Sequence, residues 1–362
     1  MKSMRKLLIA LLLLLGCAFL FSRITDLQQV AETLRKGDWR WLLFALAIQL
    51  AYVVNTGASF WAIYRLLGMN EKIERLTLLA QAANFVIVIA PSAGMGGIAV
   101  FAADARKRGH STGRVTTAAA LFVLYDYLAT LIVVLMGLLV LFRRDKLHAS
   151  EISAAVFILL LAIALASLLY LGMRSGEKLA AALAWIGSRI NRVLGIFTKC
   201  KQLDLESARN FALDAAEGLA QARRSPDGLL LPFALAMSNK ALMMAILFLM
   251  FLAFGQSFSI GTLVAGYAVG YLFTIVSPTP SGIGFVETAM TLGLNSLRVP
   301  LAPAALIVLG YRAYTLWLPF LYGMLAIRWV GRSSVDDPPE GGSQALADHN
   351  PSSATPSQDP TP

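Results

Sequence analysis

The chain has 362 residues, of which 57% are hydrophobic and 14% charged, and its mean hydropathy is +0.66. Soluble domains contain about 25% charged residues, so this composition excludes an ordinary soluble domain. The net charge of +10 does not indicate nucleic-acid binding. The basic residues cluster in short segments between apolar runs, as they do in the cytoplasmic loops of membrane proteins.

Several apolar runs reach about 20 residues, the length that spans a bilayer as a helix. We therefore expect an all-α, polytopic integral membrane protein, because a transmembrane β-barrel would show short alternating segments instead. Residues 1–6 are basic and residues 7–21 are apolar, which is also the shape of a signal peptide. No small-x-small cleavage motif follows, so we expect an uncleaved first helix with a cytoplasmic N-terminus.

Seven further apolar segments bring the expected total to about eight transmembrane helices: 41–64, 76–90, 115–142, 152–172, 229–254, 260–276 and 303–329. Two of them are short, and each runs directly into a stretch rich in proline and glycine. These breaks read "IAPSAGMGGIAVF" (89–101) and "IVSPTPSGIGFVETAM" (275–290). A half-length apolar piece follows each break, at 98–105 and 283–297, so we predict two re-entrant segments.

The order of these elements repeats within the chain. The matching intervals are 50 positions from Trp41 to Pro91 and 49 from Leu229 to Pro278, then 24 from Pro91 to Val115 and 25 from Pro278 to Pro303. We predict one repeat over about 41–142 and a second over about 229–329. Each contains a long helix, a short helix, a break, a half-helix and a long helix.

Loop charges predict how the repeats are oriented. Segment 106–114 is strongly basic, which indicates the cytoplasmic side. If each break with its half-helices makes a net crossing, the first repeat starts outside and the second inside, so the two are inverted. The uncharged loop 255–259 fits the outside, whereas the basic loop "RRDK" (143–146) also falls outside and counts against this scheme.

The transmembrane domain is expected to cover residues 1–332. Within it, connector 174–228 carries apolar residues at helical spacing with basic residues among them, which is typical of an amphipathic helix on the cytoplasmic membrane surface. Contact with anionic lipid and simple surface packing both remain open for this helix. The tail 333–362 is acidic and rich in proline and serine, so we expect it to be disordered.

The two breaks are the candidate substrate site. Irregular backbone at membrane depth persists only where protein or water satisfies it, and a new helix N-terminus attracts anions such as phosphate. Matched breaks in two repeats are typical of transporter binding sites. The candidate substrate-binding residues are Pro91, Gly94, Gly96, Gly97, Pro278, Pro280, Ser281, Gly282, Gly284, Glu287 and Arg312. The alternative is a pair of kinked helices that pack on small residues.

Four ionisable residues lie in apolar surroundings: Asp126, Lys240, Glu287 and Arg312. Burying each costs a few kcal/mol or more, so mutual pairing is expected. We predict one pair between Glu287 and Arg312 and another between Asp126 and Lys240. These pairs either hold the bundle together or take part in substrate binding or proton coupling. Asn239 either lines a polar site or bonds neighbouring helices.

The stretches "SPTPSGIGFVETAM" and "GYRAYTLWLPFLYG" (310–323) resemble the membrane region of lysylphosphatidylglycerol synthases, a region that also occurs as stand-alone flippase-like proteins. The resemblance covers about 300 residues, from Trp41 to Trp329, and rests mostly on the second half. It implies an inner-membrane protein that handles lipids or lipid-linked groups; in the bifunctional synthases this region is associated with translocating aminoacylated phosphatidylglycerol. The positions it implies are Pro278, Pro280, Gly282, Gly284, Glu287 and Arg312.

Two features depart from the family pattern. Met95–Gly96 stands in the first break where a polar residue is expected, and "YDY" (125–127) stands in a helix where Glu and Arg would be common. These departures weaken the transfer of family roles to the first half. The soluble aminoacyl-transferring domain is expected to be absent, so the synthase activity is not carried over and we expect no enzyme.

The sequence therefore predicts a lipid flippase or transporter in the bacterial inner membrane, with both termini cytoplasmic. Its partner would be an anionic phospholipid or a polyprenyl-phosphate-linked lipid. We expect no metal, cofactor or nucleic acid, because histidine clusters and nucleotide signatures are missing. The alternatives are a membrane-embedded transferase, or the partner of one, that acts on a lipid-linked substrate, and a structural or regulatory membrane subunit.

Overall fold

The computed structural model describes residues 32–89, 95–182, 185, 213–220, 222, 226–277 and 279–336. Within these residues every regular element is helical and no strand occurs, which confirms the all-α class. The expected first helix (7–21), most of connector 174–228, and Pro91, Gly94 and Pro278 lie outside the described residues.

The α-helices are α2 (Trp39–Leu66), α3 (Ile73–Ile89), α4 (Met95–Lys107), α5 (Thr112–Arg143), α6 (Ala149–Arg174), α9 (Leu230–Ala253), α10 (Ile260–Val276), α11 (Phe285–Ser296), α12 (Leu301–Arg312) and α13 (Leu318–Asp336). Two 3-10 turns, η1 (Pro226–Leu229) and η2 (Pro280–Gly282), and one π-helical turn, η3 (Ala313–Trp317), complete them. In the part of the chain that the structure describes, five stretches are long and apolar enough to cross a membrane: Trp39–Leu66, Thr112–Arg143, Ala149–Arg174, Leu230–Ala253 and Leu301–Trp329.

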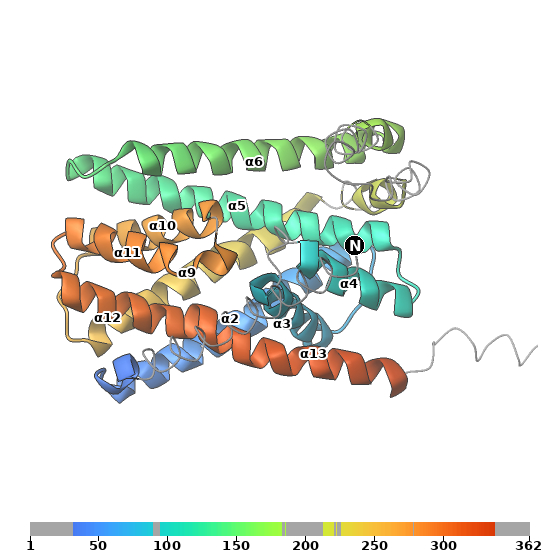
Figure 1. Ribbon diagram of the computed structural model, residues 1–362. Coiled ribbons are helices and arrows are strands. Elements are labelled where there is room, and N and C mark those ends of the chain that lie inside the picture. Colours follow the sequence, from blue (N-terminus) through green and yellow to red (C-terminus); the bar gives the residue numbers. More distant parts are fainter. Residues whose placement is uncertain are drawn as a thin grey trace, which may run out of the picture.

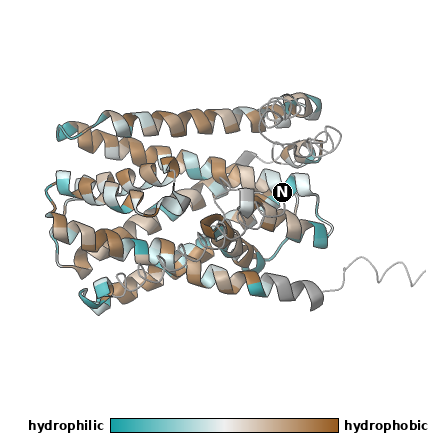
Figure 2. Cartoon of the chain, viewed as in Figure 1, coloured by the Kyte–Doolittle hydropathy of each residue, from teal (hydrophilic) through white to brown (hydrophobic). Residues whose placement is uncertain are grey.

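Helix starts follow from polar residues that precede apolar runs. Asp38, Ser111 and Ser259 each accept a hydrogen bond from a backbone N–H in the first turn of α2, α5 and α10. Such N-caps satisfy donors that have no partner within the helix. Polar residues thereby fix the beginning of these helices, and Figure 2 shows hydrophilic residues at helix ends and hydrophobic residues along the helices.

Long helices from the two halves form the centre of the bundle. Helix α2 packs along α9, and Figure 1 shows these two running in opposite directions. Helix α3 packs on α13, whereas α10 packs on α5, and α6 covers the outer side of α5. The outward face of α6 exposes large apolar side chains such as Phe157 and Leu160. An exposed apolar face of this extent suits lipid rather than water.

The short helices form two hairpins rather than net crossings of the bundle. Glu71, just before α3, accepts from His110, just after α4, over 2.9 Å, so the two ends of this hairpin lie together. Helices α10 and α11 likewise pack along each other, and Figure 1 places the two hairpins at opposite ends of the molecule. Each helix after a break therefore folds back along the one before it, so the condition of a net crossing, from which the orientation of the repeats was argued, does not hold.

Three boundaries differ from expectation. Helix α4 begins at Met95, so Gly96 and Gly97 lie in its first turn rather than in the break. Glycine is tolerated there because the first N–H groups of a helix lack intrahelical partners anyway. Helix α13 continues to Asp336, four residues into the segment expected to be disordered. The expected span 303–329 is interrupted by η3, and hydropathy carries no signal for such a π-turn.

Candidate functional site

The second break is a turn that satisfies its own backbone. After α10 ends at Val276, the hydroxyl of Thr279 donates to the carbonyl of Ile283 over 3.0 Å, and the N–H of Gly282 donates to the carbonyl of Thr279 over 3.0 Å. The hydroxyls of Ser277 and Thr279 lie 2.8 Å apart. Irregular backbone in a membrane protein requires such internal partners.

Three residues of this turn have positive φ angles: Ser281 at 54°, Gly282 at 73° and Gly284 at 78°. Gly282 is confined, because a Cβ there would lie 2.3 Å from Cγ2 of Val286. Gly284 is open, since a Cβ there would meet no atom within 4 Å. The backbone just before α11 is therefore accessible to another group, as close approach of a ligand would require.

Arg312 of α12 holds the break together. Its Nε lies 2.7 Å from Oε1 of Glu287, and its Nη2 donates to the carbonyl of Ser281 over 2.7 Å. The side chains of Arg312 and Glu287 are 6% and 19% exposed. Glu287 lies in the first turn of α11, where its negative charge complements the helix dipole. The positive charge at this break is thus largely compensated within the protein, although Oε2 of Glu287 is buried without a hydrogen-bond partner among the described residues.

The first break is described only at its edges, where α3 ends at Ile89 and α4 begins at Met95. A Cβ at Gly97 would lie 2.7 Å from Cδ1 of Ile87, so this glycine lets α4 pack closely on α3. An ion pair between Arg75 and Asp104, with an N–O distance of 2.5 Å, joins the same two helices near their other ends. Packing alone therefore accounts for Gly97.

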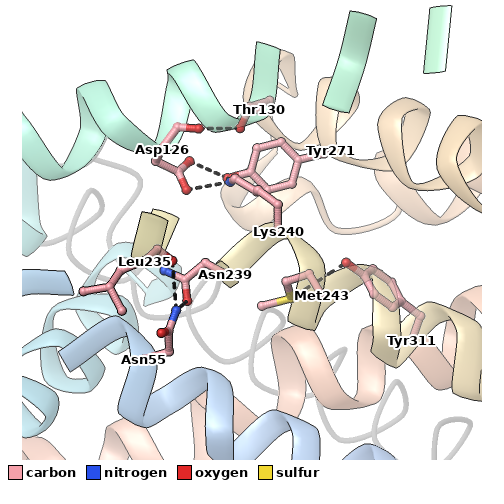
Figure 3. A network of polar contacts seen from close by, with 9 residues as sticks. All are labelled: Asn55, Asp126, Thr130, Leu235, Asn239, Lys240, Met243, Tyr271 and Tyr311. Atoms are coloured by element: carbon pink, nitrogen blue, oxygen red, sulfur yellow. Dashed lines mark hydrogen bonds and ion pairs between the residues drawn. The ribbon is translucent and has the colours of Figure 1, made fainter. Parts of the chain in front are cut away.

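The other intramembrane charges form a closed triangle (Figure 3). Lys240 of α9 lies 2.5 Å from Oδ1 of Asp126 on α5 and donates to the hydroxyl of Tyr271 on α10 over 2.7 Å. That hydroxyl donates in turn to Oδ2 of Asp126 over 2.6 Å. The side chains of Lys240 and Asp126 are 3% and 23% exposed. The charges lie deep in the bundle, since Asp126 is 14 residues, about 21 Å, from the start of α5.

A neutral hydrogen-bond pair lies beside this triangle (Figure 3). The Asn55 amide on α2 donates to Oδ1 of Asn239 on α9 over 2.7 Å and to the carbonyl of Leu235 over 2.9 Å. The hydroxyl of Tyr311 on α12 points toward Sδ of Met243 at 3.9 Å. Polar groups from α2, α5, α9, α10 and α12 thus converge on one region between the two halves.

Sequence reasoning missed two members of this polar region. A tyrosine such as Tyr271 in an apolar helix is usually read as packing or as an interface anchor, and gives no signal of its own. Asn55 did give a signal, as an amide within an apolar run, but its partner on α9 lies 184 positions away and is not readable from the sequence.

Residues 7–323 match the family model of the lysylphosphatidylglycerol synthase TM region. The chain belongs to this family. A search of curated proteins found no match. The matched range contains both breaks, the Asp126–Lys240 and Glu287–Arg312 ion pairs, four of the five membrane-crossing stretches and most of the fifth. The protein is therefore a multi-pass membrane protein related to lipid metabolism or transport.

Proposed function

We propose that the protein moves a lipid with an anionic headgroup, a phospholipid or a polyprenyl-phosphate-linked lipid, between the leaflets of the bacterial inner membrane. The observation that carries this proposal is the pair of broken-helix hairpins, one in each half, each packed on the last helix of the other half. Matched discontinuous helices at the interface of two repeats are typical of transporter binding sites.

An inverted repeat is supported by an equivalent close contact in each half. A Cβ at Gly137 of α5 would lie 2.4 Å from Cβ of Ala268 on α10, and a Cβ at Gly323 of α13 would lie 2.7 Å from the carbonyl oxygen of Gln81 on α3. Gln81 and Ala268 are 187 positions apart and Gly137 and Gly323 are 186, which matches the 187 between Pro91 and Pro278. We propose about eight spans and two re-entrant hairpins in this arrangement.

Two of the intramembrane charges also lie at corresponding positions of the two repeats. Asp126 lies 35 positions after Pro91, and Arg312 lies 34 after Pro278. Each is a charged residue in the apolar part of the span after its break, yet their signs are opposite. Ionisable residues at this depth are functional candidates by default.

The proposed topology places both termini in the cytoplasm. The ends of α2, α4, α6 and α13 lie together at one end of the molecule (Figure 1). That end carries Arg65, Lys107, Arg108, Arg114 and Arg174. A cluster of this kind is typical of the cytoplasmic side. The outward end also carries the basic residues of 143–146, so the assignment depends on the larger number of basic residues at the first end.

The decisive experiment is a leaflet-exchange assay. The purified full-length protein is reconstituted into liposomes that contain headgroup-labelled fluorescent phosphatidylglycerol, and dithionite bleaches the outer leaflet. A transporter exposes the inner-leaflet lipid, so the bleached fraction rises from about half toward completion. Asp104→Asn, which alters an ion pair outside the breaks, serves as the control. Wild-type protein that is folded and yet leaves half of the label protected across phosphatidylglycerol, cardiolipin and polyprenyl-phosphate lipids would refute the proposal.

The family name gives one specific reason for a second candidate, because this region is the membrane part of lipid-modifying synthases. In that case the protein would present a lipid to a transferase rather than move it. Mass spectrometry of lipids extracted after incubation with a membrane lysate would then reveal a covalently altered lipid that depends on this protein, without leaflet exchange by the pure protein.

A further inference from the structure

The region around Asp126 offers more hydrogen-bonding groups than its own ion pair uses. Tyr267 of α10 stacks on Tyr271 of the triangle, with ring centroids 5.8 Å apart, and Tyr52 of α2 lies near the same carboxylate. Tyr267 is 2% exposed, and its hydroxyl has no hydrogen-bond partner among the described residues. A buried hydroxyl without a partner lowers stability. A ligand oxygen that accepts from this hydroxyl would satisfy it, which points to a polar ligand beside Lys240.

Charge balance determines whether an anionic ligand must bind together with a proton. The two ion pairs Asp126–Lys240 and Glu287–Arg312 sum to zero charge. A phosphodiester carries one negative charge, and an uncompensated charge in a poorly hydrated interior is strongly disfavoured. One proton taken up at the same time restores neutrality. The Asp126 carboxylate is already paired with the Lys240 ammonium. Protonation of this carboxylate would leave the ammonium free to pair with the phosphate.

We propose that Lys240 binds the phosphate oxyanion of the transported headgroup, and that Asp126 takes up one proton as this anion displaces its carboxylate. The inference rests on the proposed function and specifies its ligand chemistry and its coupling ion. The exchange balances: an ammonium–carboxylate pair, one proton and one phosphate monoanion become an ammonium–phosphate pair and one neutral carboxylic acid. The hydroxyls of Tyr267 and Tyr271 are the donors that remain for the other phosphate oxygens.

The geometry of the triangle suits this exchange. Asp126 is the more exposed partner, at 23% against 3% for Lys240, so the group that takes up the proton is also the one that can be reached. Tyr271 joins the triangle to the second break, because α10 ends at Val276, five residues later. Displacement of Asp126 also breaks its hydrogen bond to Tyr271, which joins α5 to α10. Ligand binding is thereby transmitted to the turn that follows α10.

Asp126 is the carboxylate that faces Lys240 in this part of the bundle. The titratable groups around it are Lys240 from α9, Tyr267 and Tyr271 from α10, Tyr52 from α2, and Tyr127 on its own helix. Helix α6 carries no charged residue between Glu151 and Arg174, and the carboxylate of α4, Asp104, is paired with Arg75. The proton of the proposed exchange is therefore assigned to Asp126.

Proton uptake is measured by calorimetry on the purified full-length protein in detergent. Dihexanoyl phosphatidylglycerol is titrated in two buffers that differ in ionisation enthalpy, and the difference in heat counts the protons. We expect about one proton per bound lipid. The complex holds one proton more than the free protein, so affinity rises as pH falls, by about tenfold per unit.

Variants test whether Asp126 is the residue that takes up the proton. Asp126→Asn should bind dihexanoyl phosphatidylglycerol with no proton uptake and no pH dependence. Asp126→Asn/Lys240→Met leaves no unpaired charge, so it should fold and bind at least about tenfold more weakly, as expected for loss of a charged hydrogen bond. The matched control Asp104→Asn removes another buried, ion-paired carboxylate and should keep the proton count of the wild type.

The remaining measurements distinguish a lipid headgroup from free phosphate as the ligand. They also distinguish failure of this inference from failure of the proposed function. The counts are compared at about pH 5, where inorganic phosphate is a monoanion like the lipid phosphodiester. A proton count near one with the lipid but not with inorganic phosphate assigns the site to headgroups, and the same count with both assigns it to phosphate itself. Either result supports proton-linked anion binding at Lys240. A count near zero, or a count near one that persists in Asp126→Asn, overturns the inference. If leaflet exchange occurs with a count near zero, the proposed function survives and only this inference fails.

Discussion

Arg312 donates a 2.7 Å hydrogen bond to the backbone carbonyl of Ser281, a residue held at a φ of 54°. The same guanidinium pairs with Glu287 in the first turn of α11. One side chain on α12 therefore fixes both the irregular turn and the helix that follows it. The planar fork of arginine suits this double contact, and the point charge of lysine does not.

Substitution of Arg312 should destabilise the protein in a graded way. Arg312→Met leaves Glu287 charged and unpaired, and breaking a largely buried pair costs about 3–5 kcal/mol. Arg312→Lys keeps the charge but makes only one of the two contacts, so its loss should be smaller. Thermal unfolding of the purified protein in one detergent measures both. Glu287→Gln/Arg312→Met should recover part of the loss; equal melting temperatures for Arg312→Met and wild type would contradict this account.

The two glycines of the second break should differ in their tolerance of alanine. Gly282→Ala combines a positive φ of 73° with a Cβ 2.3 Å from Cγ2 of buried Val286. Gly284→Ala meets only the backbone strain, about 1–3 kcal/mol. We therefore expect a clearly lower melting temperature for Gly282→Ala than for Gly284→Ala. The opposite order would show that the turn is arranged differently. Leaflet exchange by Gly284→Ala then tests whether the open backbone contacts the lipid.

The contact between Gly137 and Ala268 should be exchangeable. Gly137→Ala places two Cβ atoms 2.4 Å apart, and overpacking of this kind costs about 1–3 kcal/mol. Ala268→Gly removes the opposing Cβ, so the double variant should regain the melting temperature of the wild type. Gly323→Ala instead meets the backbone oxygen of Gln81, so Gln81→Gly should not rescue it. Rescue in both halves, or in neither, would argue against these contacts.

Tyr267 and Tyr271 should separate ligand binding from stability. Tyr267→Phe removes a buried hydroxyl that has no partner, so melting temperature should stay unchanged or rise while binding of dihexanoyl phosphatidylglycerol weakens. Tyr271→Phe removes a hydroxyl that bonds both Lys240 and Asp126, so its melting temperature should fall. A hydroxyl that only supports packing would give the reverse: equal thermal losses in both variants and unchanged binding.

The topology can be tested by thiol labelling in intact cells. In a background with Cys17 and Cys200 replaced by serine, Arg106→Cys lies at the basic end and Ser257→Cys in the uncharged loop before α10, and both positions are exposed. A membrane-impermeant maleimide should label Ser257→Cys in cells and Arg106→Cys only after lysis. Labelling of Arg106→Cys in intact cells would invert the proposed orientation.

The positions of the helices were readable from the sequence because hydropathy is a local property. The expected segments 41–64, 115–142 and 152–172 agree with α2, α5 and α6 to within a few residues, and proline with glycine marked both breaks. Opposite charges in apolar surroundings also indicated two ion pairs, one between Glu287 and Arg312 and one between Asp126 and Lys240. Burial makes an unpaired charge costly, so a small set of charges leaves few ways to pair.

The direction of the chain through each break was not readable from the sequence, and the condition of a net crossing did not hold. A half-helix after a proline break has the same composition whether it continues forward or folds back. Helix α4 folds back along α3, as the contact between Glu71 and His110 shows. Such long-range contacts determine the direction, and no local pattern encodes them.

The sequence by itself determined the class of the protein, the ends of most helices, the two breaks and which charges needed partners, because hydrophobicity and backbone restrictions act within a few residues. Only the tertiary structure decided that Arg312 also binds the Ser281 carbonyl, that Tyr271 closes the triangle with Asp126 and Lys240, and that Asn55 meets Asn239. Those contacts join helices far apart in the chain. Their partners are selected by packing geometry, which a linear pattern of residues does not contain.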